Sequence, residues 1–65
     1  MKYPTVTANG ATKHGYIPVT EEYDIDSKTD MTLLDRTVEQ FRGVHIAIVR
    51  AGRKVAIWRR KGELA

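Results

Sequence analysis

Cysteine is absent from the 65 residues of this chain, which removes two common ways of stabilising a very small protein. Neither disulfide bonds nor thiolate metal sites can support the core. A domain of this length buries only about 60 % of the surface that its unfolded chain exposes, so its stability is marginal. The chain therefore predicts a single small domain over residues 1–65 that works by binding something larger.

Targeting signals and long apolar runs are missing as well. The first ten residues contain no apolar run long enough for a signal peptide. The longest uncharged stretch near the C-terminal end, residues 43–49, is far shorter than the roughly 20 residues of a membrane-spanning helix. We expect a cytoplasmic protein with no membrane partner.

Side chains that usually perform catalysis are scarce. Ser27 is the one serine, and it lies where a helix is expected to begin, while His14 and His45 lie in a loop-like segment and an expected strand. Nucleophilic catalysis needs a nucleophile, a base and an orienting group, which these residues do not supply. The glycines are scattered singly, so no phosphate-binding loop is present. The chain is not expected to be an enzyme or to bind a cofactor.

The carboxylates of residues 24–30 superficially resemble the start of a calcium loop. Lys28 occupies a ligand position, however, and Thr29 stands where the sharp turn of such a loop needs glycine. Helix capping and solubility explain these acids better, and we expect no metal site.

One amphipathic helix is predicted over residues 30–42, after an acidic connector that spans residues 20–30. Ser27, Thr29 and Asp30 are all residues that cap helices. Gly43 is placed to end the helix in a left-handed conformation. The apolar stripe has helical spacing and consists of Met31, Leu34, Val38 and Phe41.

Two runs of β-branched residues, 44–49 and 54–58, predict an antiparallel hairpin that extends to about residue 60. A turn centred on Ala51 and Gly52 would place Ile48 opposite Val55, and His45 opposite Trp58. This register puts aliphatic side chains on one face, and a slip of one residue would mix the faces. The face expected to pack on the helix consists of Ile46, Ile48, Val55 and Ile57.

The N-terminal 20 residues show little periodicity. Asn9 and Gly10 indicate a turn between two weak strands, at about residues 3–8 and 11–19. A loosely ordered arm is the alternative for this segment. Tyr16, Ile17 and Val19 are the residues expected to dock on the core. The predicted fold class is therefore α+β, with the helix packed on the C-terminal hairpin and a poorly defined N-terminal segment.

A helix-turn-helix is a competing interpretation of residues 38–60. Its turn would have to lie at one of the C-terminal glycines, but only five residues separate Gly52 from Trp58, too few for a recognition helix. Two β-branched strands explain the same residues better.

Charge is distributed unevenly along the chain, although the net charge is only +3. Seven of the eight acidic residues lie between positions 21 and 39, and residues 43–62 contain none. Such asymmetry can indicate an anionic partner for the basic end. The alternative is that acidic and basic segments face each other in the fold. The candidate binding residues on the hairpin are His45, Arg50, Arg53, Lys54, Trp58, Arg59, Arg60 and Lys61.

Two functions fit these residues. Cationic groups neutralise phosphates and an aromatic ring can stack on a base, which favours nucleic-acid binding. Tryptophan and arginine also dominate protein interfaces, so a protein-binding adaptor or small inhibitor, phage-like in size, fits as well. A homodimer formed through strand pairing, or by covering the helix, is a further hypothesis.

Overall fold

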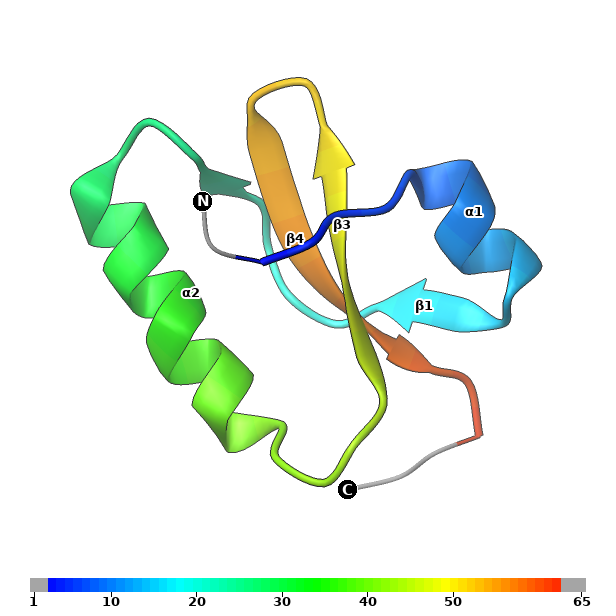
Figure 1. The fold of residues 1–65 in the computed structure, drawn as a ribbon. Helices are drawn as coiled ribbons and strands as arrows, with labels where there is room; N and C mark the ends of the chain where they lie inside the picture. The colour runs from blue at the N-terminus through cyan, green and yellow to red at the C-terminus, as the bar shows by residue number, and fades with distance from the viewer. Residues whose placement is uncertain (1–2, 63–65) are drawn as a thin grey trace.

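Two helices and a four-stranded antiparallel sheet make up residues 3–62, the part of the chain that this computed structural model describes (Figure 1). The predicted α+β class is confirmed. None of the helices described is long and apolar enough to cross a bilayer. In chain order the elements are α1 (Ala8–Lys13), β1 (Tyr16–Pro18), β2 (Tyr23–Asp24), α2 (Lys28–Gln40), β3 (Ile46–Ala51) and β4 (Lys54–Arg60).

Helix α2 confirms the amphipathic helix predicted by the apolar stripe, beginning two residues earlier than expected. Ser27 is the N-cap, and its hydroxyl accepts a hydrogen bond from the Asp30 N–H at 3.2 Å. This bond satisfies one of the N–H groups that a helix start leaves without an internal partner. Gly43 has φ +87°, the left-handed conformation that redirects the chain toward β3.

The β3–β4 hairpin is also confirmed, but its register differs from the predicted one. Gly52, not Ala51, is the first residue of a two-residue turn, with φ +64°, a conformation that glycine adopts easily. Moving the turn by one residue moves every cross-strand pair by two, so Ile48 faces Ile57 and Ala47 faces Trp58. A shift of two residues keeps each side chain on its face, so the predicted faces survive.

The core lies between α2 and one face of the hairpin. Leu34 packs with Ile48, Val55 and Ile57, and the Ile57 side chain is 0 % exposed. The predicted packing between the helix stripe and this face is confirmed. The half-buried side chains around this cluster are Tyr3, Val19, Tyr23, Ile25, Met31, Val38, Phe41 and Ile46.

Strand β4 is central in the sheet. β3 pairs with one edge, while β1 and β2 pair with the two ends of the other edge. Between these two short strands, Val19 N–H donates to the Ile57 carbonyl, and Thr20 accepts a bond from the Ile57 N–H. β1 and β2 therefore act as one interrupted edge, and the acidic connector of the sequence contains a strand.

The N-terminal segment differs most from the prediction, because helix α1 replaces the turn at Asn9 and Gly10. The Thr7 hydroxyl accepts a hydrogen bond from the Gly10 N–H at 3.1 Å and caps the helix. Six residues are too few for a helix that is stable in isolation. Ala11 is 2 % exposed, so packing against the sheet holds α1. The helix-turn-helix interpretation is wrong, because its C-terminal residues form strands.

Candidate functional site

The candidate binding residues do not form a single hairpin face, because they lie at the two ends of the hairpin. Arg50, Arg53 and Lys54 lie at the β3–β4 turn, which we call the tip. His45, Arg59, Arg60 and Lys61 lie at the opposite end, which we call the base. Arg53 and Arg59 are six positions apart in the sequence, about 20 Å at the rise of a β-strand. The two groups therefore have to be considered separately.

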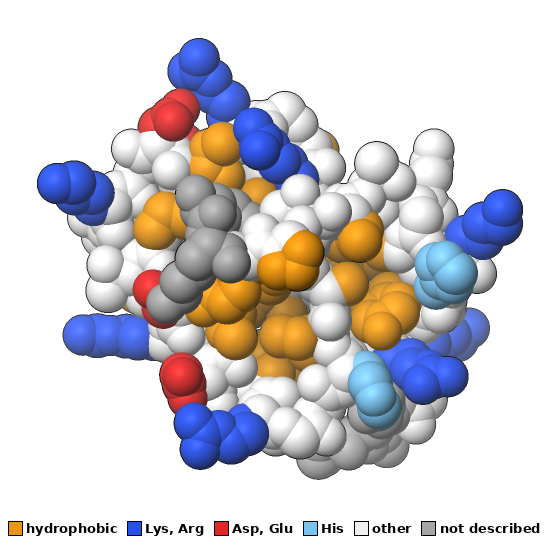
Figure 2. Space-filling view, in the orientation of Figure 1, with side chains coloured by type: hydrophobic (Ala, Val, Ile, Leu, Met, Phe, Trp, Pro, Cys, Tyr) orange, Lys and Arg blue, Asp and Glu red, His pale blue; other side chains and the backbone are white. Residues whose placement is uncertain are grey.

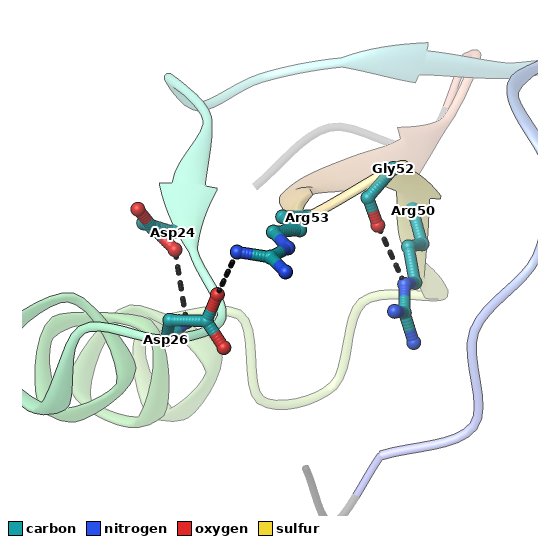
Figure 3. A network of polar contacts seen from close by, with 5 residues as sticks. All are labelled: Asp24, Asp26, Arg50, Gly52 and Arg53. Carbon is teal, nitrogen blue, oxygen red and sulfur yellow. Dashed lines mark hydrogen bonds and ion pairs between the residues drawn. The ribbon is translucent and has the colours of Figure 1, made fainter.

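Of the cations at the tip, Arg53 is engaged by an acid and Arg50 by a backbone carbonyl (Figure 3). The Arg53 Nη1 atom lies 3.3 Å from the Asp26 Oδ2 atom, and Lys54 lies opposite Asp24 in the register of β2 and β4. Arg50 donates from Nε to the Gly52 carbonyl at 2.8 Å, which holds its guanidinium against the turn. An exposed ion pair contributes only about 0–1 kcal/mol of stability. Within residues 3–62, Arg50 and Lys54 form no ion pair with a carboxylate, so Asp24 and Asp26 lower the positive charge of the tip without removing it.

The fold brings these acids to the tip because β2 pairs with the first residues of β4. The Asp24 N–H donates to Asp30 Oδ2 at 2.8 Å, and Asp24 Oδ1 accepts from the Asp26 N–H at 2.8 Å. These bonds tie the connector to the start of α2. The carboxylates that resemble a calcium loop are thus used by the backbone and by Arg53. Within residues 3–62, no three acidic or histidine side chains form a group that could hold a metal ion.

At the base, cations from a distant part of the sequence join those of the hairpin. Arg60 pairs with Tyr16 of β1, and the Lys61 N–H donates to the Gly15 carbonyl at 2.6 Å. These contacts bring the C-terminal end of α1, which carries Lys13 and His14, beside the end of β4. His14 and Arg60 line the same pocket.

His45 lies on the same side as Arg60, whose backbone N–H donates to the His45 carbonyl at 3.1 Å. His45, Arg60 and Lys61 also line a shallow depression of about 380 Å³. Within residues 3–62, Lys13, Arg60 and Lys61 form no ion pair with a carboxylate. We call this cationic area the basal surface; it consists of Lys13, His14, His45, Arg60 and Lys61.

Arg59 and Trp58 lie on opposite faces of the sheet. Arg59 alternates with Arg60 along β4, so its side chain projects to the face that carries α2. Trp58 projects to the same face as Arg60, where it is half-buried and pairs with Ala47 and Pro18. The predicted pairing of Trp58 with His45 is wrong because the turn is displaced by one residue.

Lys13 and His14 are the site residues that sequence reasoning missed. They follow Asn9 and Gly10 in a segment predicted to be a turn, and nothing in the local pattern links them to Arg60, far along the chain. Comparison of the chain with family models, with curated proteins and with solved structures found no match. Its function therefore has to be argued from its own surface.

Proposed function

We propose that this protein is a non-enzymatic module that binds the phosphate backbone of a nucleic acid with its basal surface. The proposal depends on the convergence of cations from α1 and the end of β4 on one surface. Within residues 3–62, Lys13, Arg60 and Lys61 have no carboxylate partner there. A guanidinium can bind a phosphate with two parallel hydrogen bonds, and an ammonium binds it as a point charge. Both displace counterions from the nucleic acid and gain affinity from their release.

The charge pattern of the rest of the molecule supports this orientation. Asp24 and Asp26 lie at the tip, at the other end of the hairpin from Arg60. Asp24 and Asp26 lower the positive potential of the tip, so phosphates are attracted more strongly by the basal surface, and the charge distribution orients the protein as it approaches. The modest net charge of +3 is compatible with binding because the acids and the exposed cations are separated in space.

Trp58 provides a way to observe the interaction. It is the single tryptophan of the chain, it is half-buried, and it lies two residues from Arg60 on the same face of the sheet. A ligand on the basal surface should change its environment. Its partial burial means that it acts mainly as a packing residue, and the cations supply the affinity.

The test is a titration of Trp58 fluorescence with short single- and double-stranded DNA and RNA at two salt concentrations. We compare Arg60→Glu/Lys61→Glu at the base with Arg53→Glu/Lys54→Glu at the tip, which changes the net charge equally. The basal double variant should weaken binding roughly tenfold or more and should lower the salt slope by about 0.9 per lost phosphate contact on duplex DNA. The tip variant should stay within about twofold, because Arg53 is already paired with Asp26 and the two nearby acids lower the positive potential of the tip.

Equal losses in the two variants would show that only net charge matters, and binding that does not depend on salt would exclude phosphate contacts. Either result contradicts the proposal. A second candidate function, protein binding, is favoured by a different feature, an apolar groove beside β3, whose ligand is argued separately.

A further inference from the structure

An open groove of about 760 Å³ lies along one half of the outer edge of β3. It is bounded by α1 on one side and by residues 3–7 on the other; we call this segment the strap. Figure 2 shows apolar side chains gathered at the centre of this face, with histidines and cations at the right and both acids and cations at the left. The apolar side chains in the lining are those of Tyr3, Pro4, Val6, Ala11, Tyr16, Val38, Ile46, Ala47 and Ile48.

The β3 edge inside this groove offers backbone hydrogen-bonding groups. The strap bonds the edge at a single point, where the Val6 N–H donates to the Ile48 carbonyl at 3.0 Å and the Val6 carbonyl accepts from the Arg50 N–H at 2.9 Å. The backbone groups of an antiparallel strand point alternately to its two sides. The Ile46 N–H, the Ile46 carbonyl and the Ile48 N–H therefore point to the side of β3 that Val6 occupies. No residue among 3–62 is hydrogen-bonded to these three groups. They form an edge ready to pair.

Pro4 explains why the strap covers only part of β3. The hydrogen bonds of a parallel strand pair repeat every two residues. If the strap paired with β3 for two more residues before Val6, the N–H of residue 4 would have to donate to the Ile46 carbonyl. Proline has no N–H, so pairing stops there. The preceding residue leads away from β3, because the Tyr3 hydroxyl donates to Asp35 Oδ1 on α2 at 2.7 Å.

We propose that an extended segment of a partner protein adds a strand to this half of β3. Its backbone would bond the Ile46 carbonyl and the Ile48 N–H, and its apolar side chains would occupy the groove. Arg60 and His14 line the groove, and within residues 3–62 no acidic side chain does, so charge complementarity favours a segment that carries a carboxylate. The ligand class is thus an extended apolar peptide with an acidic residue.

Other occupants fit the groove less well. A second copy of this chain would have to bring its own strap and α1 into the recess that already lies between these elements. A phosphate backbone would desolvate against an apolar lining that offers few hydrogen-bond donors. The inference is independent of nucleic-acid binding, because it depends on the β3 edge and the apolar lining; the two sites share only Arg60 and His14.

The test begins with selection from a random peptide library displayed against the full chain, followed by titration of the selected peptides into isotope-labelled protein. Selected sequences should alternate apolar residues and contain an acid. The amide signals of Ile46, Ala47 and Ile48 should shift. No enrichment, shifts confined to other elements, or self-association through β3 in sedimentation would each overturn the proposal.

Two variants sharpen the result. Val6→Glu places a charge on the groove wall and should weaken peptide binding roughly tenfold or more, because an unpaired carboxylate is costly in apolar surroundings. Leu33→Glu is its matched control, since Leu33 is equally exposed, at 45 %, and lies on α2 outside the groove. Thermal unfolding of both variants verifies that they fold. An equal loss of peptide affinity in the two would contradict the groove as the binding site.

Pro4→Val tests the edge without adding charge. It restores an N–H at position 4, so the strap can extend its pairing along β3 and compete with the peptide. Peptide affinity should fall while the Ile48 N–H exchanges more slowly with solvent; unchanged affinity despite slower exchange would overturn strand addition. Oligonucleotide binding should be unaffected by Pro4→Val, so failure here is distinguishable from failure of the proposed function.

Discussion

The tip and the base of the hairpin carry similar numbers of cations but differ in what the rest of the chain brings to them. At the tip, β2 and the connector to α2 place Asp24 and Asp26 beside the cations, and Arg53 forms an ion pair with Asp26. At the base, α1 delivers Lys13 and His14 beside Arg60, and the positive charge accumulates. The comparison shows that strand pairing, rather than the number of basic residues, decides which cations have acids beside them.

The largest effect is expected from Ala11→Asn, which should destabilise α1 and with it the basal surface. Ala11 is 2 % exposed and holds α1 on the sheet, so a polar amide there loses solvent without gaining a partner. We expect a loss of about 1–3 kcal/mol in the free energy of unfolding. A loss of that size lowers the melting temperature by roughly 4–8 °C per kcal/mol in a domain this small. Thermal denaturation followed by circular dichroism measures it.

Ala8→Asn is the control for this substitution, because Ala8 is exposed at the start of the same helix. It should change the unfolding free energy by less than about 0.7 kcal/mol, the span of ordinary helix propensities. At temperatures where both variants are folded, Ala11→Asn alone should weaken oligonucleotide binding. Equal stability of the two variants would mean that burial of Ala11 does not hold α1 against the sheet. It would contradict the role of this contact in forming the basal surface.

A smaller effect is expected from making the tip resemble the base, with Asp24→Asn/Asp26→Asn. At position 24, asparagine keeps a side-chain oxygen that can accept the hydrogen bond from the N–H of residue 26. The negative charge beside Arg53 and Lys54 disappears. Stability should change by about 1 kcal/mol or less, as for other exposed pairs. Oligonucleotide affinity should rise a few-fold at low salt, because a second cationic area becomes available. Weaker binding in the same titration would contradict the distinction between tip and base.

Much of the fold could be predicted from the sequence because its longer elements have clear periodicity. The spacing of Met31, Leu34 and Val38 predicted α2, and the alternation of Ile46 and Ile48 with Ala47 predicted the faces of the hairpin. The turn was misplaced by one residue, because the position of a single glycine does not show whether it comes first or second in the turn.

The short elements could not be predicted, for physical reasons. α1 is six residues long and is maintained by the Thr7 cap and the burial of Ala11, so it has no periodicity of its own to recognise. β2 is two residues long and exists because β4 offers an edge to it.

The candidate site was predictable only in composition. All the basic residues of the hairpin were visible in the sequence, but their division into two groups depends on tertiary contacts. The pairing of Arg53 with Asp26, and of the α1 end with Arg60, connects segments far apart in the chain. The sequence left open whether acids and bases face each other. The structure shows that they do so at the tip.

The smallest effect concerns the strap, which pairs with β3 at Val6 and is tied to α2 by Tyr3. The hydrogen bond that Tyr3 donates to Asp35, together with burial and the charges of Asp35 and Glu39, raises the pKa of the Tyr3 hydroxyl from 10.0 to about 12. A raised pKa means that folding favours the protonated hydroxyl. Its contribution to stability is complete below pH 10 and is lost as the pH rises toward about 12.

Tyr3→Phe removes this bond and should cost less than about 1 kcal/mol, because the hydroxyl is only partly buried. The difference in unfolding free energy between the native protein and the variant should be constant up to pH 10 and should shrink above it. Denaturant titrations across this range measure the difference, and the variant corrects for the other tyrosines and the lysines. A constant difference up to about pH 12 would mean that Tyr3 holds the strap by packing alone. The strap would then be held in place by apolar contacts, and raising the pH to about 12 would not release it.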